Sequence, residues 1–539
     1  MFHYGPVHFH GPIHYQIGYR VVFPEEPCVG GLDEMIAHPF SDVPMVRLGS
    51  GGSVKVRLRD YDWRQHLQEA HAIDQQNNGT IDYFRLGLPW IAQKLNYNGM
   101  VNSFNWPLNH HRLDIVRENY TFREVANELV SNRFKWQAWA SEYVTDKFAE
   151  VIAERFVPRT RDIVGSHDHH LYRLGHHLLK RGVDAPLAFF LHTPVPTYAS
   201  YSNLQPQQQA YLRDALTSLF AYNHIGVQSS RDLLNLWDLI AHNERPQNPA
   251  LYTPYKMDRR IGNVTLSTYV SILPAVGHNR LYEGQAIDPQ NVAEAEKYLR
   301  DKGFKKPPNI FTWGRLDYSK GGVNLLKGIR YAIEELGVPP GEIRFLHQAA
   351  HGSRAEIKAF QREHDELQRL HKKLMDDYGG EGEGRGLQVH FETKTLERPI
   401  ALAIARKVGK EGGICIFPSL ADGYGLVINE CYSAQDPQEP CSMVIGKSMG
   451  AGPVVDGGAY QVDAVSWVEI GETIARIWKD KNNDKGKRDR QTRYGIGINN
   501  INEYTNSQWQ AKLLNVAAEE YHRSLLLNRP RYSSVILGL

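Results

Sequence analysis

The segment 419–430 combines acids, glycines and a helix start in a pattern that could bind a phosphorylated ligand. The apolar run 414–417 before it predicts a buried parallel strand. From Leu426 onwards the apolar spacing predicts a helix, whose first N–H groups and dipole favour an anion. Asp422 precedes this helix and Glu430 lies inside it. The glycines between the two acids allow the backbone to approach a ligand closely.

This arrangement fits a nucleotide sugar. One of the two acids could bind sugar hydroxyls and the other the ribose, while the backbone amides of the first helical turn bind the diphosphate. An ordinary βα unit with two surface acids explains the segment equally well, because a strand, a glycine loop and a helix follow one another in many proteins. The segment by itself leaves both interpretations open.

A basic loop follows another predicted strand at about residues 309–314. Arg315 and Lys320 flank turn-forming residues in this loop. A guanidinium fork and an ammonium at one strand end suit a diphosphate leaving group. Two unrelated surface cations are the alternative.

Ionisable residues also follow predicted strands in the first half of the chain. Arg20 lies near the end of a first strand, Asp168 follows the strand at 163–166, and His192 follows the apolar run 187–191. Open α/β sheets bind ligands at the carboxyl ends of parallel strands, so these side chains are candidates for one site. For Arg20 alone, an ordinary solvated arginine is the simpler interpretation.

Aromatic residues occur in an unusually polar stretch at 95–116, which contains Tyr97 and Trp106. Such side chains form the walls that hold sugar rings, which predicts a sugar-binding surface. A long amphipathic helix is predicted at 119–156. Its aromatic stripe of Trp136, Trp139 and Tyr143 has helical spacing and is predicted to face the core.

The chain contains 24 histidines, and His167-Asp168-His169-His170 is the densest group of possible metal ligands. A metal-dependent hydrolase built on this loop is an alternative. The spacing fits neither a HExxH helix nor a cysteine frame, so no metal site is predicted.

Composition describes a globular protein of 539 residues, 42% hydrophobic and 23% charged, with a formal charge of +2. This balance predicts neither nucleic-acid nor membrane binding. The four cysteines show no CxxC spacing and are expected to be reduced core residues of a cytoplasmic protein. No apolar run approaches about 18 residues, so no membrane span is expected.

Strands alternate with helices along most of the chain, which predicts two α/β domains, and the polar clusters at the strand ends predict a cleft between them. An irregular stretch at 275–289 marks the boundary. We expect domains at 1–285 and 286–500, followed by a helical segment at 501–539 that packs back on the first domain. The length is consistent with this division.

Taken together, the motifs resemble the trehalose-6-phosphate synthase family of retaining glycosyltransferases. The resemblance implies the α/β GT-B architecture, in which two Rossmann-like domains face each other across a cleft. The resemblance runs from about Gln16 to Gln435 and follows the order of the family's motifs. Its pieces are Arg20 with Gly30-Gly31-Leu32, Tyr97-Asn98 with Trp106-Pro107, His167-Asp168-His169-His170, Phe190–Pro196, Gly314–Gly321, Ser353-Arg354, and Asp422–Glu430 continuing to Pro437.

The resemblance implies a role for each matching residue. His192, Asp168, Arg315 and Lys320 would be catalytic. The donor would be bound by Gly31, Arg315, Lys320, Asp422, Gly423, Tyr424, Gly425, Leu426 and Glu430. The phosphorylated acceptor would be bound by Arg20, Tyr97, Trp106, Asp168 and Arg354.

The reaction implied is glucosyl transfer with retention of the α configuration, without a cofactor or catalytic metal. The donor implied is a nucleotide sugar, with UDP-glucose preferred, and the acceptor is glucose 6-phosphate, which would give trehalose 6-phosphate. Glycerol 3-phosphate, a cyclitol phosphate or another sugar remain alternative acceptors, as does a silent sugar-phosphate sensor. A homo-oligomer is left open.

Several positions depart from the family pattern. Gly423-Tyr424-Gly425 stands where the family has Gly-Met-Asn, Asn429 where it has Lys, and Gly314 where it has Asp. The segment 462–465 replaces an Asn-Pro-x-Asp motif. The predicted diphosphate residues are kept while the surroundings of both sugars differ, so the transfer chemistry is expected and the substrates are left open.

Overall fold

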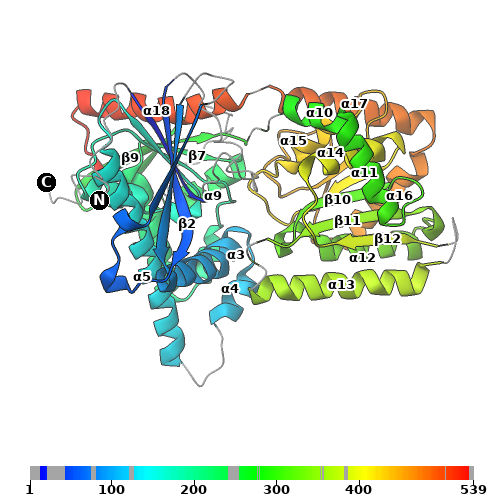
Figure 1. Cartoon of the computed structure of the whole chain (residues 1–539), viewed down its shortest axis with the longest axis horizontal. Coiled ribbons are helices and arrows are strands. Elements are labelled where there is room, and N and C mark those ends of the chain that lie inside the picture. Colours follow the sequence, from blue (N-terminus) through cyan, green and yellow to red (C-terminus); the bar gives the residue numbers. More distant parts are fainter. Residues whose placement is uncertain are drawn as a thin grey trace. The chain divides into compact units, whose positions relative to one another are not determined.

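The computed structural model describes residues 12–20, 43–73, 80–120, 127–240, 254–275, 277, 279–352, 354, 357–380, 386–503 and 505–532. The chain divides into two compact units (Figure 1). Unit 1 comprises residues 1–275 and 506–539, and unit 2 comprises residues 276–505.

Unit 1 is built on a nine-stranded sheet with the order β3-β4-β2-β1-β5-β6-β7-β9-β8. The strands are β1 (His14–Arg20), β2 (Met45–Val54), β3 (Leu67–Ile73), β4 (Thr80–Pro89), β5 (Ile163–His167), β6 (Leu187–Phe190), β7 (His224–Val227), β8 (Tyr255–Ile261) and β9 (Val264–Ile272). The seven inner strands are parallel, and the edge strands β3 and β8 are antiparallel to their neighbours. The central strands read as apolar runs because both faces of a parallel sheet are covered.

Unit 1 contains nine α-helices among its described residues. They are α2 (Trp90–Lys94), α3 (Trp106–Asn109), α4 (Leu113–Tyr120), α5 (Asn127–Val151), α6 (Leu174–Lys180), α7 (Tyr198–Ser202), α8 (Pro206–Ser218), α9 (Ser230–Ile240) and α18 (Asn506–Leu526). Two π-helical segments, Leu95–Asn105 and Ile152–Phe156, adjoin α2 and α5.

The last helix, α18, belongs to unit 1, although it follows unit 2 in the sequence (red in Figure 1). It contacts β5, β6 and β7. Trp509, Leu513 and Leu514 are fully buried there, and the Trp509 indole packs edge-on against Phe190. The prediction that the C-terminal helix packs back on the first domain is confirmed.

Unit 2 contains a six-stranded parallel sheet with the order β12-β11-β10-β13-β14-β15. Its strands are β10 (Ile310–Arg315), β11 (Arg344–Ala350), β12 (Gln388–Glu392), β13 (Ile414–Phe417), β14 (Ser442–Gly446) and β15 (Tyr460–Val462). Its helices are α10 (Asn279–Ile287), α11 (Pro289–Asp301), α12 (Gly322–Glu334), α13 (Lys358–Tyr378), α14 (Arg398–Lys410), α15 (Val427–Ala434), α16 (Trp467–Asp480) and α17 (Asp484–Ile501). This doubly wound order has the topology expected of a Rossmann-like unit.

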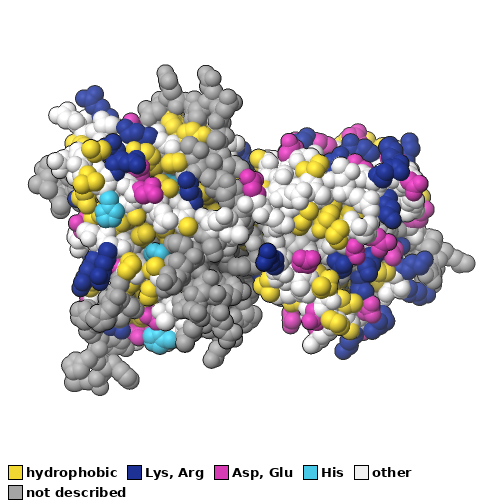
Figure 2. All heavy atoms as spheres, turned by 90° about the horizontal axis from the view of Figure 1, so that it is seen from above, with side chains coloured by type: hydrophobic (Ala, Val, Ile, Leu, Met, Phe, Trp, Pro, Cys, Tyr) yellow, Lys and Arg dark blue, Asp and Glu magenta, His cyan; other side chains and the backbone are white. Residues whose placement is uncertain are grey.

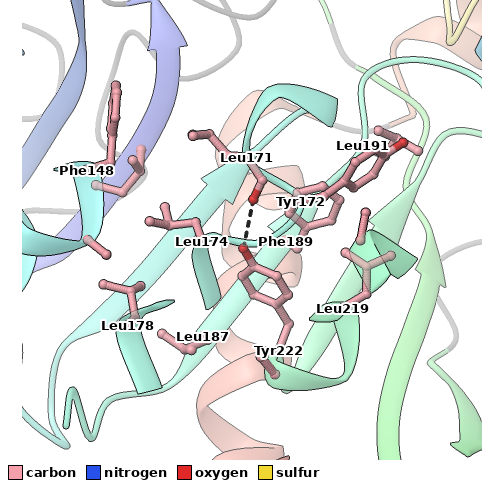
Figure 3. Close-up of a cluster of buried hydrophobic side chains, with 14 of the residues drawn as sticks. Phe148, Leu171, Tyr172, Leu174, Leu178, Leu187, Phe189, Leu191, Leu219 and Tyr222 are labelled. Atoms are coloured by element: carbon pink, nitrogen blue, oxygen red, sulfur yellow. Dashed lines mark hydrogen bonds between the residues drawn. The ribbon is translucent and has the colours of Figure 1, made fainter. Parts of the chain in front are cut away.

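Each unit has its own hydrophobic core. Figure 3 shows part of the unit 1 core, where Phe189 of β6 packs near Leu174, Leu178 and Tyr222. The buried Tyr222 hydroxyl donates to the Leu171 carbonyl at 3.3 Å, so its polar end is satisfied inside an apolar cluster. These separate cores hold the two sheets and their loops in place independently.

The units divide at residue 275 and not at 285, because α10 packs on α14 and α15 of unit 2. The chain returns from unit 2 to unit 1 after residue 505, and not after residue 500 as predicted. The helix predicted at 119–156 is α5 with its π-helical end. The prediction of a buried aromatic stripe on α5 is wrong for Trp136, whose side chain is 58% exposed, whereas Tyr143 packs against the core.

Charges of both signs are interspersed over the face of unit 2 drawn in Figure 2. That face therefore carries no field of a single sign. Among the described helices, none has the length and apolar character needed to cross a membrane.

Candidate functional site

The loop between β13 and α15 in unit 2 is braced by backbone contacts with the loop that follows β14. The Gly450 amide donates to the Asp422 carbonyl at 3.1 Å, and the Ala451 amide donates to the Tyr424 carbonyl at 3.2 Å. A Cβ atom at Gly450 would lie 1.6 Å from the Gly423 carbonyl oxygen, so only glycine fits there. This close packing fixes the main chain around Asp422.

Lys320 and Asp422 form an ion pair in this loop region. Lys320 ends the short turn Tyr318–Lys320 after β10, and Asp422 lies in the loop after the neighbouring strand β13. The two residues are far apart in sequence, and parallel strand pairing brings them to the same sheet edge. The structure thus pairs Lys320, which is predicted to bind the diphosphate, with Asp422, which is predicted to bind the donor sugar.

Two further predicted cations lie at the end of β10. Arg315 is the last residue of the strand and is exposed. Arg354 is ion-paired with the buried Asp317, with 3.1 Å between its Nη1 and Oδ2. The other carboxylate oxygen of Asp317 accepts from the Ser319 amide at 3.0 Å. Asp317 therefore ties Arg354 to the turn that carries Lys320.

Glu430 on α15 is held through both carboxylate oxygens. Its Oε2 accepts from the Trp313 indole at 3.2 Å, and its Oε1 lies 3.2 Å from Nε of Arg398. Sequence reasoning missed both partners. Trp313 and Arg315 occupy alternate positions of β10 and so share a face of the sheet, a signal that could have identified Trp313.

Asp168 of unit 1 adopts a backbone conformation rare for a non-glycine residue, with φ of 72°. Its amide donates to the Phe190 carbonyl at 2.8 Å, which ties it to the end of β6. Its carboxylate lies 2.9 Å from His169 Nδ1 and 3.5 Å from His170 Nδ1. Burial alone would raise the pKa of Asp168, but these two imidazoles hold it well below its ordinary value. The group is therefore a carboxylate at neutral pH.

His192 is the end of a buried chain of hydrogen bonds that starts at Gln16. Oε1 of Gln16 lies 2.6 Å from His167 Nε2, and His167 Nδ1 lies 3.1 Å from His192 Nε2. Burial lowers the pKa of His167 well below its ordinary value and that of His192 to about 4, so both rings are neutral near pH 7.

The amide oxygen of Gln16 can only accept, which places the proton of neutral His167 on Nε2. His167 Nδ1 must then accept from His192 Nε2–H. The remaining nitrogen of His192, Nδ1, is left as an acceptor, and it can receive a hydrogen bond from a substrate hydroxyl. Gln16 and His167 are thus positioning residues that sequence reasoning did not assign.

The predicted aromatic residues lie close to this histidine group. The Tyr19 ring stacks with Tyr97, with ring centroids 5.7 Å apart, and with His170, with centroids 4.7 Å apart, and the Tyr97 and His170 centroids are 6.5 Å apart. Trp106 is 6% exposed and packs 4.0 Å from the His110 ring. Tyr97 therefore offers a partly open ring, whereas Trp106 is mainly a packing residue in this structure.

Two predicted site residues cannot be placed. Gly31 lies outside the described residues, and of Arg20 only the backbone, at the end of β1, is described. Their roles stay predictions.

Asp168, His169 and His170 have ligand atoms within 4.8 Å of one another, which is compatible with a metal ion. The contacts of the Asp168 carboxylate with both imidazoles explain this arrangement without one. The metal-dependent hydrolase therefore gains no support from the geometry.

Comparison with known proteins shows the family of the chain. The sequence model of glycosyltransferase family 20 matches residues 57–519, which is most of the chain. The chain belongs to glycosyltransferase family 20. The expected enzyme class, a glycosyltransferase of the trehalose-6-phosphate synthase kind, is confirmed.

Individual relatives of this glycosyltransferase are distant. A trehalose-6-phosphate synthase of Enterobacter sp. strain 638 is 26% identical over 387 residues, which are 71% of this chain and 72% of the relative. One from Escherichia coli O9:H4 is 27% identical over 359 residues, 66% of each chain.

Solved structures show the same fold. A crystal structure of an alpha,alpha-trehalose-phosphate synthase (UDP-forming) from Burkholderia xenovorans, described as a complex with glucose-6-phosphate, aligns with a TM-score of 0.75 at 20% identity. It covers 94% of this chain and 99% of the other. An Escherichia coli structure described as bound with UDP-2-fluoro glucose aligns with a TM-score of 0.73 at 22% identity, covering 94% and 99%. The predicted GT-B fold class is confirmed.

Two residues of the loop before α15 have close side-chain neighbours in unit 2. Gly425 has φ of 94°, and a Cβ atom there would lie 2.3 Å from the Met449 methyl group. Met449 thus fills the space of the side chain that Gly425 lacks. The Tyr424 side chain is 3% exposed, and its phenol hydroxyl is hydrogen-bonded to Asn429 in the interior.

Proposed function

We propose that this enzyme transfers glucose from UDP-glucose to glucose 6-phosphate with retention of configuration, giving trehalose 6-phosphate and UDP. The observation that carries the proposal is the Lys320–Asp422 ion pair beside the glycine loop of α15. Family membership supports transfer from a sugar donor, and the residues of this loop support a nucleotide diphosphate as the rest of that donor.

The donor residues of unit 2 offer complementary groups for each part of a nucleotide sugar. Lys320, Arg315 and the amides at the start of α15 would face the diphosphate, because they carry positive charge. Glu430, oriented by Trp313 and Arg398, would accept from ribose hydroxyls. In this structure Asp422 neutralises Lys320, so donor binding would exchange a carboxylate for phosphate oxygens at the same ammonium.

Residues of unit 1 would act on the sugars. Asp168 is an acceptor held by two imidazoles, and His192 presents a neutral nitrogen. Both can orient sugar hydroxyls by accepting hydrogen bonds. Arg20, Tyr97 and Trp106 of unit 1, together with Arg354 of unit 2, are proposed to bind the acceptor, with the two arginines on its phosphate.

In the proposed reaction the bond between glucose C1 and the β-phosphate oxygen breaks, and a bond from C1 to the acceptor oxygen forms on the same face. The acceptor hydroxyl proton moves to the departing phosphate oxygen, as the resemblance implies. An oxocarbenium-like transition state needs charge stabilisation on the leaving diphosphate, which Arg315, Lys320 and the α15 amides would supply. No step requires a metal or cofactor.

The choice of substrates rests on what related structures are described as binding, namely glucose-6-phosphate in one and UDP-2-fluoro glucose in another. Glycerol 3-phosphate and a cyclitol phosphate stay alternative acceptors, because the surroundings of both sugars depart from the pattern of the family that the motifs resemble.

Nucleotide release tests the proposal. UDP-glucose, GDP-glucose and ADP-glucose are each incubated with the enzyme in EDTA, with and without each acceptor. We expect release from UDP-glucose that depends on glucose 6-phosphate. Release only with another acceptor would keep the chemistry and replace the acceptor. Nucleotide binding without release from any pair would favour the silent sensor.

A further inference from the structure

Three cysteines of unit 2 converge in its interior, and the proposed transfer reaction uses none of them. Cys415 lies on β13, Cys431 on α15, and Cys441 directly precedes β14. Their Sγ atoms all lie within 4.8 Å of one another, and those of Cys431 and Cys441 are 4.0 Å apart. All three are buried as free thiols. We refer to them as the trithiol cluster.

A glutamine side chain fixes two members of the trithiol cluster. Nε2 of Gln435 lies 3.8 Å from the Cys431 sulfur, and its Oε1 accepts from the Cys441 amide at 3.0 Å. A Cβ atom at Gly409 would lie 2.4 Å from that Oε1, so the absence of a side chain at Gly409 leaves the space that Gln435 occupies. The two sulfurs are therefore held together by packing and by hydrogen bonds.

The three sulfurs also interact with one another. The Cys431 and Cys441 sulfurs lie 4.0 Å apart, within hydrogen-bonding distance for thiols. With the Cys415 sulfur inside the same 4.8 Å limit, the three sulfurs are close enough to bind a single atom together.

The number of donors and the burial restrict which ligand can bind. Zn²⁺ in a structural site takes four ligands, whereas this group offers three among the described His, Cys, Asp and Glu side chains. Charge is costly in a buried site. Three thiolates with Cu(I) or Zn²⁺ give an anionic complex, but three thiolates with trivalent arsenic complete its coordination and leave it neutral.

We infer that the trithiol cluster is a binding site for trivalent arsenic, taken up as arsenous acid. Three As–O bonds and three S–H bonds break, three As–S bonds form, and three water molecules leave. Nothing is oxidised or reduced, so no further reactant is needed.

Arsenic binding would also disturb the donor site. Sulfurs as far as 4.8 Å apart must draw together around one atom. Cys431 is the residue after Glu430 on α15, so a shift of this helix would misplace the carboxylate that Trp313 and Arg398 hold. This inhibition rests on the proposed function, whereas binding itself does not.

The test uses the full chain, reduced with a phosphine and titrated with sodium arsenite. Native mass spectrometry should show one arsenic atom per chain with the loss of three hydrogens. Cys431→Ser should weaken binding at least about tenfold, since only two thiolates remain. Cys28→Ser, which changes the one cysteine outside the cluster, should bind as the unaltered chain does.

Arsenic X-ray absorption of the unaltered chain keeps the test independent of how the variants fold. A first shell of three sulfurs is expected, and a shell containing oxygen would overturn the inference. Equal binding by Cys431→Ser, loss of binding in Cys28→Ser, or stoichiometric binding of zinc in place of arsenite would also overturn it. Arsenic bound by the cluster in an enzyme without transferase activity would leave this inference intact and contradict only the proposed function.

Discussion

Lys320 and Asp422 show how two oppositely charged residues can serve one ligand. Their side chains are 30% and 16% exposed, so solvent screens their attraction in part. A diphosphate carries more charge than a carboxylate and would compete well for the ammonium. Lys320 is therefore assigned to binding the diphosphate leaving group.

Replacing Lys320 by alanine should lower kcat/KM by about 10²- to 10³-fold, because one preorganised donor to the developing charge is lost. Steady-state kinetics with UDP-glucose and glucose 6-phosphate measure this. Lys485→Ala is the matched control, since that side chain is 79% exposed and outside the site. Equal rates for Lys320→Ala and the unaltered enzyme would contradict the assignment.

The chain from Gln16 through His167 to His192 gives a second prediction at this scale. Gln16→Leu removes the acceptor that fixes the His167 tautomer, so His192 would present Nδ1 as an acceptor only part of the time. We expect kcat to fall about tenfold with little change in donor KM. Nitrogen NMR of the His192 ring should show mixed tautomers.

Ser166→Ala controls for a polar-to-apolar change in the same buried region, because Ser166 lies on β5 opposite Ile17. It should leave kcat and the His192 tautomer unchanged. A single His192 tautomer in Gln16→Leu would show that the chain does not fix the ring.

At the scale of elements, a buried histidine pair joins β11 to α13. His347 Nδ1 lies 3.0 Å from His371 Nε2, and the His371 ring stacks on Phe391 with centroids 4.6 Å apart. In Figure 1, α13 runs along the side of the sheet formed by β11 and β12. Burial lowers the pKa of His347 to about 3 and that of His371 to about 2. Packing of α13 therefore requires both rings to be neutral.

This pair predicts a loss of stability in acid. The unfolded chain protonates these histidines below about pH 6.5, while the folded state resists until about pH 3, so stability falls as pH drops through that window. As the pH falls from about 7.5 to about 5, each ring should lower the free energy of unfolding by about 2 kcal/mol.

His371→Phe should reduce that acid-induced loss by about 2 kcal/mol in urea unfolding of the variant at the two pH values. His522→Gln, which alters an exposed histidine of α18, should not. If the free energy of unfolding fell equally between the two pH values in the unaltered chain, His371→Phe and His522→Gln, the histidine pair would not govern the sensitivity to acid.

Much of the element pattern could be predicted from the sequence. The strand before 419–430 and the helix after it were correctly predicted, because a short apolar run, a glycine loop and helical spacing are local signals. Buried parallel strands can likewise be predicted from continuous runs of apolar residues.

The contacts within the site could not be predicted in the same way. Gln16 reaches His167 across two paired strands that are 151 positions apart in sequence, and no local pattern distinguishes it from any other polar strand residue. Trp136 was expected inside because its helical spacing matches a core stripe, but spacing cannot tell whether anything packs on that face. Side-chain partners depend on sheet order, which sequence periodicity does not determine.

At the scale of the whole molecule, the residues proposed to bind the donor and those proposed to act on the sugars belong mainly to different units, each with its own core. All described donor residues, from Arg315 to Glu430, belong to unit 2, while Asp168, His192 and Tyr97 belong to unit 1. Each unit has its own sheet, so each can hold its residues without the other.

Residues 276–505 expressed alone should therefore fold and bind UDP within about tenfold of the affinity of the full chain. Calorimetric titration measures this, with Lys320→Ala in the same fragment as the control that should bind more weakly. A folded fragment that does not bind UDP would show that unit 1 supplies an essential part of the nucleotide site.

The most direct test of the central claim identifies the product of the reaction. UDP-glucose labelled at C1 of the sugar is incubated with glucose 6-phosphate, and the product is analysed by NMR and mass spectrometry. Retaining transfer to glucose 6-phosphate predicts that the label appears in a non-reducing disaccharide phosphate, with the α configuration at the labelled carbon. Label in free glucose, or a β linkage, would contradict retaining transfer to a phosphorylated acceptor.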